Sequence, residues 1–313
     1  MGDDSGGSAS GAGEPSHQDG ASRFAELGGP VHYLDYPAGS AAPAFLCLHG
    51  LGGSAVNFRA VAPRLRSRAR VVAPDLLGHG RTYAGRVGDG GAVEANLDLI
   101  ARFVGEVVGP PVVLVGHSLG GILALLHTMR VPSDVQRLVL LDPPVPGRSR
   151  WSRDWRLTAR LAFLRAPGVG GLVARQLERL TPEALVARQL ADATPHADRI
   201  PADVVDASVA EVVARRAGED ARAAQDLQWA AILETIALLA RPRAWRQRLG
   251  TIRTPVLWLL GEDDPKAPYD DVLALARSRP DWLLETRPGV GHLPHLEDPG
   301  WTADRVLAWA EGR

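Results

Sequence analysis

The sequence predicts an α/β protein in which a mostly parallel sheet carries helices on both faces. Short apolar runs alternate with segments of helical periodicity, and several runs are apolar at successive positions rather than at alternate ones. Strands of that kind are typical of a parallel sheet that is covered on each face. One long stretch, 147–249, has helical signals only, which predicts an all-helical insertion into the α/β core.

The expected strands and helices of the first half follow one another closely. Residues 31–36 have the pattern of an edge strand, and further strands are expected at 44–48, 70–73, 111–115 and 137–141. Apolar residues recur at helical spacing near 58–65 and over 93–108. Residues 119–129 are apolar all round, so we expect a buried helix directly after the strand at 111–115.

Helical periodicity continues through the insertion, and the α/β pattern then resumes. Helices are expected at 204–216 and 228–239, and Leu157, Leu161 and Leu164 share one helical face. Strands at 255–260 and 282–285 then alternate with helices at 269–277 and 301–309. The predicted organisation is a disordered tail (1–22), a first core part (23–146), the insertion (147–249) and a second core part (250–313). The tail has too few large apolar side chains to offset its ordering entropy.

Composition and charge exclude several classes of protein. With 45% hydrophobic and 23% charged residues, the chain is globular rather than fibrous or wholly disordered. A net charge of −1 creates no field that favours nucleic acid or an anionic membrane. The only cysteine, Cys47, cannot form an internal disulfide or a cysteine zinc cluster, and the only lysine, Lys266, is not in a P-loop.

We expect a cytoplasmic protein without a membrane span. The longest charge-free stretch, 107–129, could cross a bilayer by its length. However, its two prolines and its Gly-His-Ser sequence at 116–118 indicate a strand, a sharp turn and a helix. Asp3 and Asp4 stand where a secretory signal needs positive charge.

The sequence Gly116-His117-Ser118-Leu119-Gly120 is a G-x-S-x-G motif between an expected strand and an expected helix. A serine on such a tight turn projects its hydroxyl away from the sheet, and the flanking glycines remove side chains that would collide there. The amides at the start of the following helix favour a developing oxyanion. Ser118 is therefore the candidate nucleophile.

A serine hydroxyl needs a base that is itself oriented by an acid. Gly261-Glu262-Asp263-Asp264 follows the expected strand at 255–260, and Gly291-His292 follows the one at 282–285. The carboxyl ends of parallel strands share one edge of the sheet, so these residues are expected near Ser118. Asp263 or Asp142 could replace Asp264 as the acid, and His295 could replace His292 as the base.

Five motifs in order resemble the α/β-hydrolase superfamily, in the branch with a helical cap, over nearly all of the chain after the tail. Besides the serine motif, they are His49-Gly50-Leu51-Gly52-Gly53, the turn Asp75–Gly80, the acid loop Gly261–Asp264 and the histidine loop Gly291-His292 with Glu297 and Pro299. The resemblance implies the α/β-hydrolase fold, with 147–249 as the cap. It further implies Ser118 as nucleophile, Asp264 as acid and His292 as base, with the amides of Leu51 and Leu119 as the oxyanion hole and no cofactor.

Several other residues have simpler interpretations. We expect His49 and His117 to orient loops, His79 to pack in its turn, His295 to lie on the surface and Cys47 to be inert core. The cap carries 17 arginines and 12 acidic residues between 148 and 249. Its arginine stripe of Arg153, Arg156 and Arg160 is either a solvated helix face or a surface that attracts an anionic substrate. The four cap tryptophans at 151, 155, 229 and 245 are expected in the cap core.

The motifs also distinguish the chain from relatives within the superfamily. Ser118 stands where dehalogenases and epoxide hydrolases carry an aspartate, and Leu293 stands where hydroxynitrile lyases carry a lysine. The leading hypothesis is a hydrolase of carboxylic esters, thioesters or lactones that acts on a small-molecule substrate. Perhydrolysis or carbon–carbon bond hydrolysis by the same triad is a second hypothesis, and a non-catalytic receptor is a third.

Overall fold

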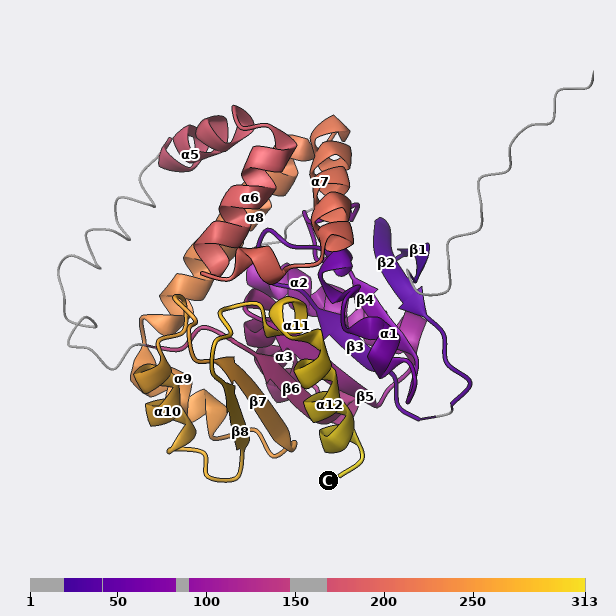
Figure 1. Cartoon of the computed structure of the whole chain (residues 1–313), viewed down its shortest axis with the longest axis vertical. Helices are drawn as coiled ribbons and strands as arrows, with labels where there is room; N and C mark the ends of the chain where they lie inside the picture. The colour runs from indigo at the N-terminus through magenta and orange to yellow at the C-terminus, as the bar shows by residue number, and fades with distance from the viewer. Residues whose placement is uncertain (1–19, 41, 83–89, 147–167, 313) are drawn as a thin grey trace, which may run out of the picture.

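The computed structural model describes residues 20–40, 42–82, 90–146 and 168–312. Within them, eight strands form one sheet in the order β1-β2-β4-β3-β5-β6-β7-β8 (Figure 1). The strands are β1 Ala21–Glu26, β2 Pro30–Tyr36, β3 Phe45–Leu48, β4 Val71–Pro74, β5 Val112–His117, β6 Val135–Leu141, β7 Val256–Gly261 and β8 Leu283–Arg287. The β1–β2 and β2–β4 pairs are antiparallel, and every pair from β4 across to β8 in the sheet order is parallel. The predicted mostly parallel sheet is confirmed.

The amino-terminal edge of the sheet differs from the prediction. We expected residues 31–36 at the edge, but β2 lies between β1 and β4, and β1 is the outer strand. Ala21 and Ser22, which the sequence assigned to the tail, belong to β1 and pair with Asp35 and Leu34. Gly20 is described directly before β1, and the tail's remaining residues, 1–19, lie outside the described part of the chain. The pattern missed β1 because most of this edge strand faces solvent and lacks an apolar run.

Two apolar cores fill the two faces of the sheet. On one face pack α2 Gly91–Phe103, α3 Leu119–Arg130, α9 Pro242–Leu249 and α10 Tyr269–Ala276. On the other pack the 3-10 helix η1 Ala55–Phe58, α1 Ala62–Leu65 and α12 Pro299–Ala310. Neighbouring residues on one strand serve opposite cores: Leu114 faces the first, and Val113 and Val115 face the second. This two-sided burial explains why the central strands are continuous apolar runs in the sequence.

The described part of the insertion, 168–249, is built from helices. They are α5 Val169–Glu178, α6 Pro182–Ala193, the 3-10 turn η5 Ala197–Arg199, α7 Ala202–Ala217, α8 Ala221–Leu239 and α9. In Figure 1, α5 to α8 stand over the carboxyl ends of the strands. Cap residues 147–167 lie outside the described residues, and with them the arginine stripe, the expected leucine face, Trp151 and Trp155. Trp245 is buried, but in the cluster that covers the sheet rather than in a separate cap core, and Trp229 is half-buried.

Two polar contacts, one at the start of α2 and one at Arg81, fasten the cap to the core. Helix α2 begins at glycine residues that have no capping side chain, and the carboxylate of Glu234 on α8 accepts its Ala92 and Val93 amides at 2.9 and 2.8 Å. Arg81 donates to Glu211 on α7, with a distance of 3.0 Å between Nε and Oε1. Glu234 thus supplies from the cap the acceptor that an N-cap residue would otherwise provide.

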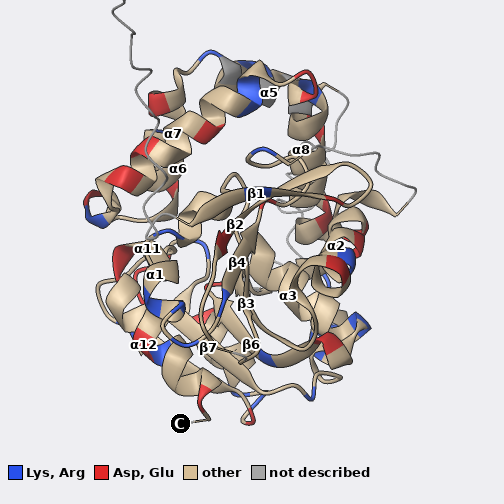
Figure 2. Cartoon of the chain, turned by 90° about the vertical axis from the view of Figure 1, so that its right-hand side faces the viewer, with Lys and Arg blue, Asp and Glu red and all other residues tan. Residues whose placement is uncertain are grey.

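Charges of both signs are interspersed over the outer helices, while the strands between them carry few (Figure 2). Among the helices that the structure describes, none combines the length and apolarity needed to cross a bilayer.

Candidate active site

Ser118 occupies a sharp turn between β5 and α3. Its backbone angles are φ 51° and ψ −115°, a conformation that non-glycine residues rarely adopt and that neighbouring packing must enforce. A Cβ at Gly116 would stand 2.5 Å from the carbonyl oxygen of Gly120, and a Cβ at Gly120 would collide with the carbonyl of Leu48. Gly116 is therefore required by close packing against the start of α3, and Gly120 by close packing against the end of β3.

The structure brings together the three residues expected to form a triad. The distance from Ser118 Oγ to His292 Nε2 is 2.9 Å, and that from His292 Nδ1 to Asp264 Oδ2 is 2.8 Å. Asp264 and His292 are buried, whereas Ser118 is partly exposed. With Nδ1–H donating to the carboxylate, the lone pair on Nε2 faces the serine hydroxyl. The three side chains follow β5, β7 and β8, so the parallel sheet creates the juxtaposition.

The two alternative acids have other partners. Asp263 Oδ2 lies 2.9 Å from Nε2 of His196 in the cap. Asp142 is fully buried and accepts the Gly261 amide at 3.1 Å. Burial and the neighbouring charge of Asp264 raise the pKa of Asp142 well above the ordinary carboxyl value, which favours its protonated form. Of the three aspartates, Asp264 is the one whose carboxylate is hydrogen-bonded to the His292 ring.

The histidine loop is held by hydrogen bonds to its backbone. Glu297 on the short helix α11 Pro294–Glu297 accepts the amides of Gly291 and Leu293 at 2.7 and 2.9 Å. His117 Nε2–H donates to the carbonyl of His292 at 2.8 Å. The amides on either side of His292 and its own carbonyl are thus fixed, which restricts how the imidazole can move.

The loop expected to supply half of the oxyanion hole lies against the nucleophile. A Cβ at Gly50 would be 3.1 Å from Cβ of Ser118. His49 Nδ1–H donates to the Gly50 carbonyl at 2.7 Å, and His49 Nε2 accepts the Leu76 amide at 3.0 Å. Because the peptide group is planar, fixing the Gly50 carbonyl also fixes the direction of the Leu51 N–H. Leu119 is the first residue of α3, directly after Ser118.

Asp75 ties the turn 75–80 to three other segments. Its buried carboxylate accepts the Ala55 amide at 2.6 Å, the Arg81 amide at 2.9 Å and Nδ1–H of His32 at 2.7 Å. A Cβ at Gly80 would collide with this carboxylate. Asp75 therefore has a structural role beside the oxyanion loop. Sequence reasoning missed His32, since no local pattern links residue 32 to residue 75.

The remaining histidines lie where expected, with one exception. His79 packs in its turn, its Nδ1 3.0 Å from the Leu77 carbonyl oxygen. His295, expected on the surface, is fully buried between Phe58 and His117, with ring centroids 5.3 and 4.5 Å away. The prediction was wrong because α11 folds inward when Glu297 caps the histidine loop. Cys47 is buried in β3, and burial raises the pKa of its thiol.

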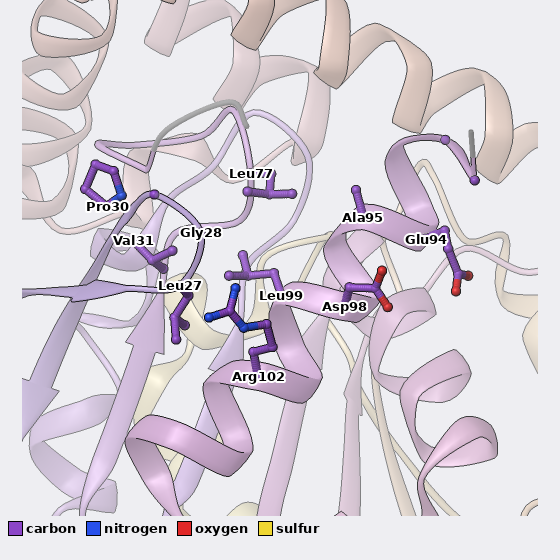
Figure 3. Close-up of a pocket in the computed structure, with 13 residues that line it drawn as sticks. Leu27, Gly28, Pro30, Val31, Leu77, Glu94, Ala95, Asp98, Leu99 and Arg102 are labelled. Atoms are coloured by element: carbon purple, nitrogen blue, oxygen red, sulfur yellow. The ribbon is translucent and has the colours of Figure 1, made fainter. Parts of the chain in front are cut away.

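Two pockets are lined by described residues that do not include the triad. One, of about 270 Å³, opens between the β1–β2 hairpin and α2 (Figure 3). Its charged side chains are already paired: Glu94 and Asp98 with Arg130, and Arg102 with Glu106. Where side chains are described, no group of three or more His, Cys, Asp or Glu residues could hold a metal ion.

The fold and the site together define a hydrolase, and comparison with known proteins gives the family. The chain belongs to the Alpha/beta hydrolase family, whose model matches residues 45–305. An uncharacterized protein of Mycobacterium tuberculosis is 30% identical over 277 residues, which cover 84% of this chain and 74% of the relative. The sn-1-specific diacylglycerol lipase ABHD11 of Mus musculus is 26% identical over 286 residues, which cover 90% of this chain and 85% of the relative.

Solved structures share the fold. The epoxide hydrolase VrEH1 of Vigna radiata superposes with a TM-score of 0.73 at 19% identity, over 96% of this chain and 100% of that one. At that identity the likeness concerns the fold alone.

Proposed function

We propose that the protein is a serine hydrolase that cleaves a carboxylic ester, thioester or lactone through an acyl-enzyme intermediate. The observation that carries this proposal is the continuous hydrogen-bonded chain from Ser118 Oγ through the His292 imidazole to the Asp264 carboxylate. The mouse relative is named as a diacylglycerol lipase, and lipase activity is a form of ester hydrolysis.

In the first half-reaction, Ser118 Oγ attacks the acyl carbon while His292 Nε2 takes the hydroxyl proton. Asp264 holds the imidazole in its Nδ1–H tautomer and stabilises the imidazolium as it forms. The imidazolium then gives its proton to the leaving alcohol or thiol. In the second half-reaction His292 activates water, which releases the acid and regenerates Ser118.

Negative charge on the acyl oxygen is stabilised by backbone amides. The N–H groups of Leu51 and Leu119 flank the serine and are the proposed donors, and the start of α3 adds its favourable dipole. His49 contributes indirectly, because it holds the Gly50 carbonyl and hence the Gly50–Leu51 peptide.

The test is labelling and turnover of Ser118→Ala. Wild type should react with a fluorophosphonate probe at Ser118, and the variant should lose labelling and all but a residual ester turnover, with unchanged folding. A variant that keeps more than roughly a tenth of wild-type turnover would show that Ser118 is not the nucleophile. Labelling without turnover of any ester, thioester or lactone would favour carbon–carbon bond hydrolysis, and an unlabelled wild type would favour a receptor.

We also propose that the cap determines the substrate, because the core motifs bind only the carbonyl that all such substrates share. Gln189 on α6 offers a test: its amide would lie 3.0 Å from a Cβ at Gly52 in the oxyanion loop. Gln189→Ala should change the order of kcat/KM values across ester chain lengths. Gln247→Ala, on the exposed face of α9, is the control. Identical chain-length profiles for both variants and wild type would contradict the role of this position.

A further inference from the structure

One short cap segment contacts the residues that flank both His292 and Asp264. This 193–200 segment begins at the last residue of α6, includes η5 and ends two residues before α7. Its contacts are with the loops after β7 and β8, which carry the proposed acid and base.

The first contact is with Gly291, the residue before His292. Thr194 is buried, and a Cβ at Gly291 would lie 2.8 Å from the Thr194 Cβ and collide with its hydroxyl. The glycine of the Gly-His motif is thus required by the approach of the cap. Two residues earlier, the guanidinium of Arg199 donates to the Gly289 carbonyl.

The second contact is apolar and lies on the other side of His292. Leu293 and Leu296 pack with Ala193 and Ile200 in a buried cluster that joins the cap to the core. The cap segment therefore covers the histidine loop from both flanks of the catalytic ring.

The third contact is with Asp263, the residue before Asp264. His196 Nε2 lies 2.9 Å from Asp263 Oδ2, and the Asp263 amide donates to the Val290 carbonyl at 2.9 Å. The first of these bonds fixes the acid loop to the cap, and the second fixes it to the histidine loop. The bond to His196 also keeps the Asp263 carboxylate directed toward the cap, while the Asp264 carboxylate contacts His292.

We infer that the 193–200 segment sets the geometry of the acid–base pair, and that His196 is the positioning residue for Asp264. The inference rests on the proposed function, since the pair it positions is the proposed catalytic one. A partly exposed polar pair of this kind contributes little to stability, so the role of His196 is geometric. Small displacements of catalytic groups lower the rate steeply while leaving substrate binding largely intact.

The experiment compares three substitutions in the full chain. His196→Ala should lower kcat about tenfold with KM changed by less than about twofold, because Asp264 loses a constraint on its loop. His196→Gln should restore kcat to within about threefold of wild type, since the glutamine amide can donate from nearly the position of Nε2. Asp263→Ala should lower kcat as His196→Ala does, and the double variant should be no worse than either single one.

A matched control separates positioning from general loosening of the cap. Glu234→Ala breaks a different cap–core contact, at the start of α2, and should leave kcat within about twofold of wild type. Equal losses of kcat in Glu234→Ala and His196→Ala, additive losses in the double variant, or wild-type kcat in His196→Ala would each overturn the inference.

A spectroscopic readout separates failure of this inference from failure of the proposed function. The low-field proton resonance of His292 Nδ1–H reports its bond to Asp264 and requires no turnover. It should shift or broaden in His196→Ala and be unchanged in Glu234→Ala. A perturbed resonance in a chain that hydrolyses no ester would support the positioning and refute the function, whereas an unperturbed one would refute the positioning.

Discussion

Two aspartates lie close to one another, and Asp264 contacts the His292 ring. Asp142 is buried next to Asp264, and burial and the charge of Asp264 raise the pKa of the Asp142 carboxyl. A neutral carboxylic acid can be replaced by an amide of the same shape with little loss. An ionised carboxylate that orients a histidine cannot, because the amide stabilises no imidazolium and can select the wrong tautomer.

Asp264→Asn should therefore lower kcat by about 10⁴-fold, as other triad acids do, and Asp142→Asn by less than about twofold. Steady-state kinetics with one ester checks both, and thermal melts show that each variant is folded. The opposite ranking would move the acid role to Asp142.

Asp142→Asn should also change how stability depends on pH. Because the folded-state pKa of Asp142 is raised, its proton stabilises the fold below the ordinary carboxyl pKa, and this contribution is lost as pH rises toward the folded-state value. The asparagine has no such loss. The unfolding free energy of the variant relative to wild type should increase from about pH 4 to pH 7. A difference that is independent of pH would show that Asp142 is ionised in the folded protein.

At the scale of elements, β1 shows how an edge strand can be held by side chains as much as by burial. Its register pairs six residues with β2, yet most of them are exposed. Ser22 Oγ lies 2.9 Å from His32 Nε2, Arg23 pairs with Asp35 at 3.1 Å, and the Phe24 ring is 5.2 Å from the His32 ring. Through His32, this strand reaches Asp75 and the turn beside the oxyanion loop.

Removal of residues 1–26 should lower Tm, because β2 becomes an exposed edge and His32 loses the hydroxyl partner at Nε2. The expected decrease is about 2–4 °C for each kcal/mol of stability lost in a domain of this class. Removal of residues 1–19 leaves β1 in place and is the control. Equal Tm values for the two truncations would show that β1 adds nothing to stability.

At the scale of the whole molecule, a group of neutral histidines is buried around the site. Burial lowers the pKa of His49, His79, His117 and His295, and the values for His79 and His295 fall to about 3. In the unfolded chain these rings titrate near their ordinary pKa of about 6.5. Their contribution to stability is thus complete above that pH and is lost as pH falls toward the folded-state values.

The free energy of unfolding should therefore decrease below pH 6.5, by about 1.4 kcal/mol per pH unit for each buried histidine. Urea denaturation at several pH values between 5 and 8 measures the slope. His295→Phe should reduce the slope by roughly one proton, because a phenyl ring keeps the stacking on Phe58 and cannot be protonated. A flat profile between pH 7 and pH 5 would contradict the burial of these rings.

The sequence by itself determined the fold class and the candidate triad. The spacing of apolar residues along the chain is a local property, so it identified the central strands, the helices between them and a helical insertion. Glycines mark turns where a side chain would collide, so Gly116 and Gly120 indicated the elbow around Ser118. The rule that parallel strands end at one edge then predicted that the loop 261–264 and His292 lie near Ser118, and the resemblance selected Asp264 within that loop. The structure brings Ser118, His292 and Asp264 within hydrogen-bond distance.

Only the tertiary structure decided the features that depend on distant neighbours. The pairing of β1 with β2, the burial of His295 and the bond between His196 and Asp263 join segments that no local pattern connects. Asp142 and Asp264 follow neighbouring strands and look alike in sequence, yet Asp264 contacts the His292 ring, whereas burial and the neighbouring Asp264 raise the pKa of Asp142. Strand order, desolvation and the placement of the cap are properties of the assembled chain, because each arises from contacts between residues far apart along it.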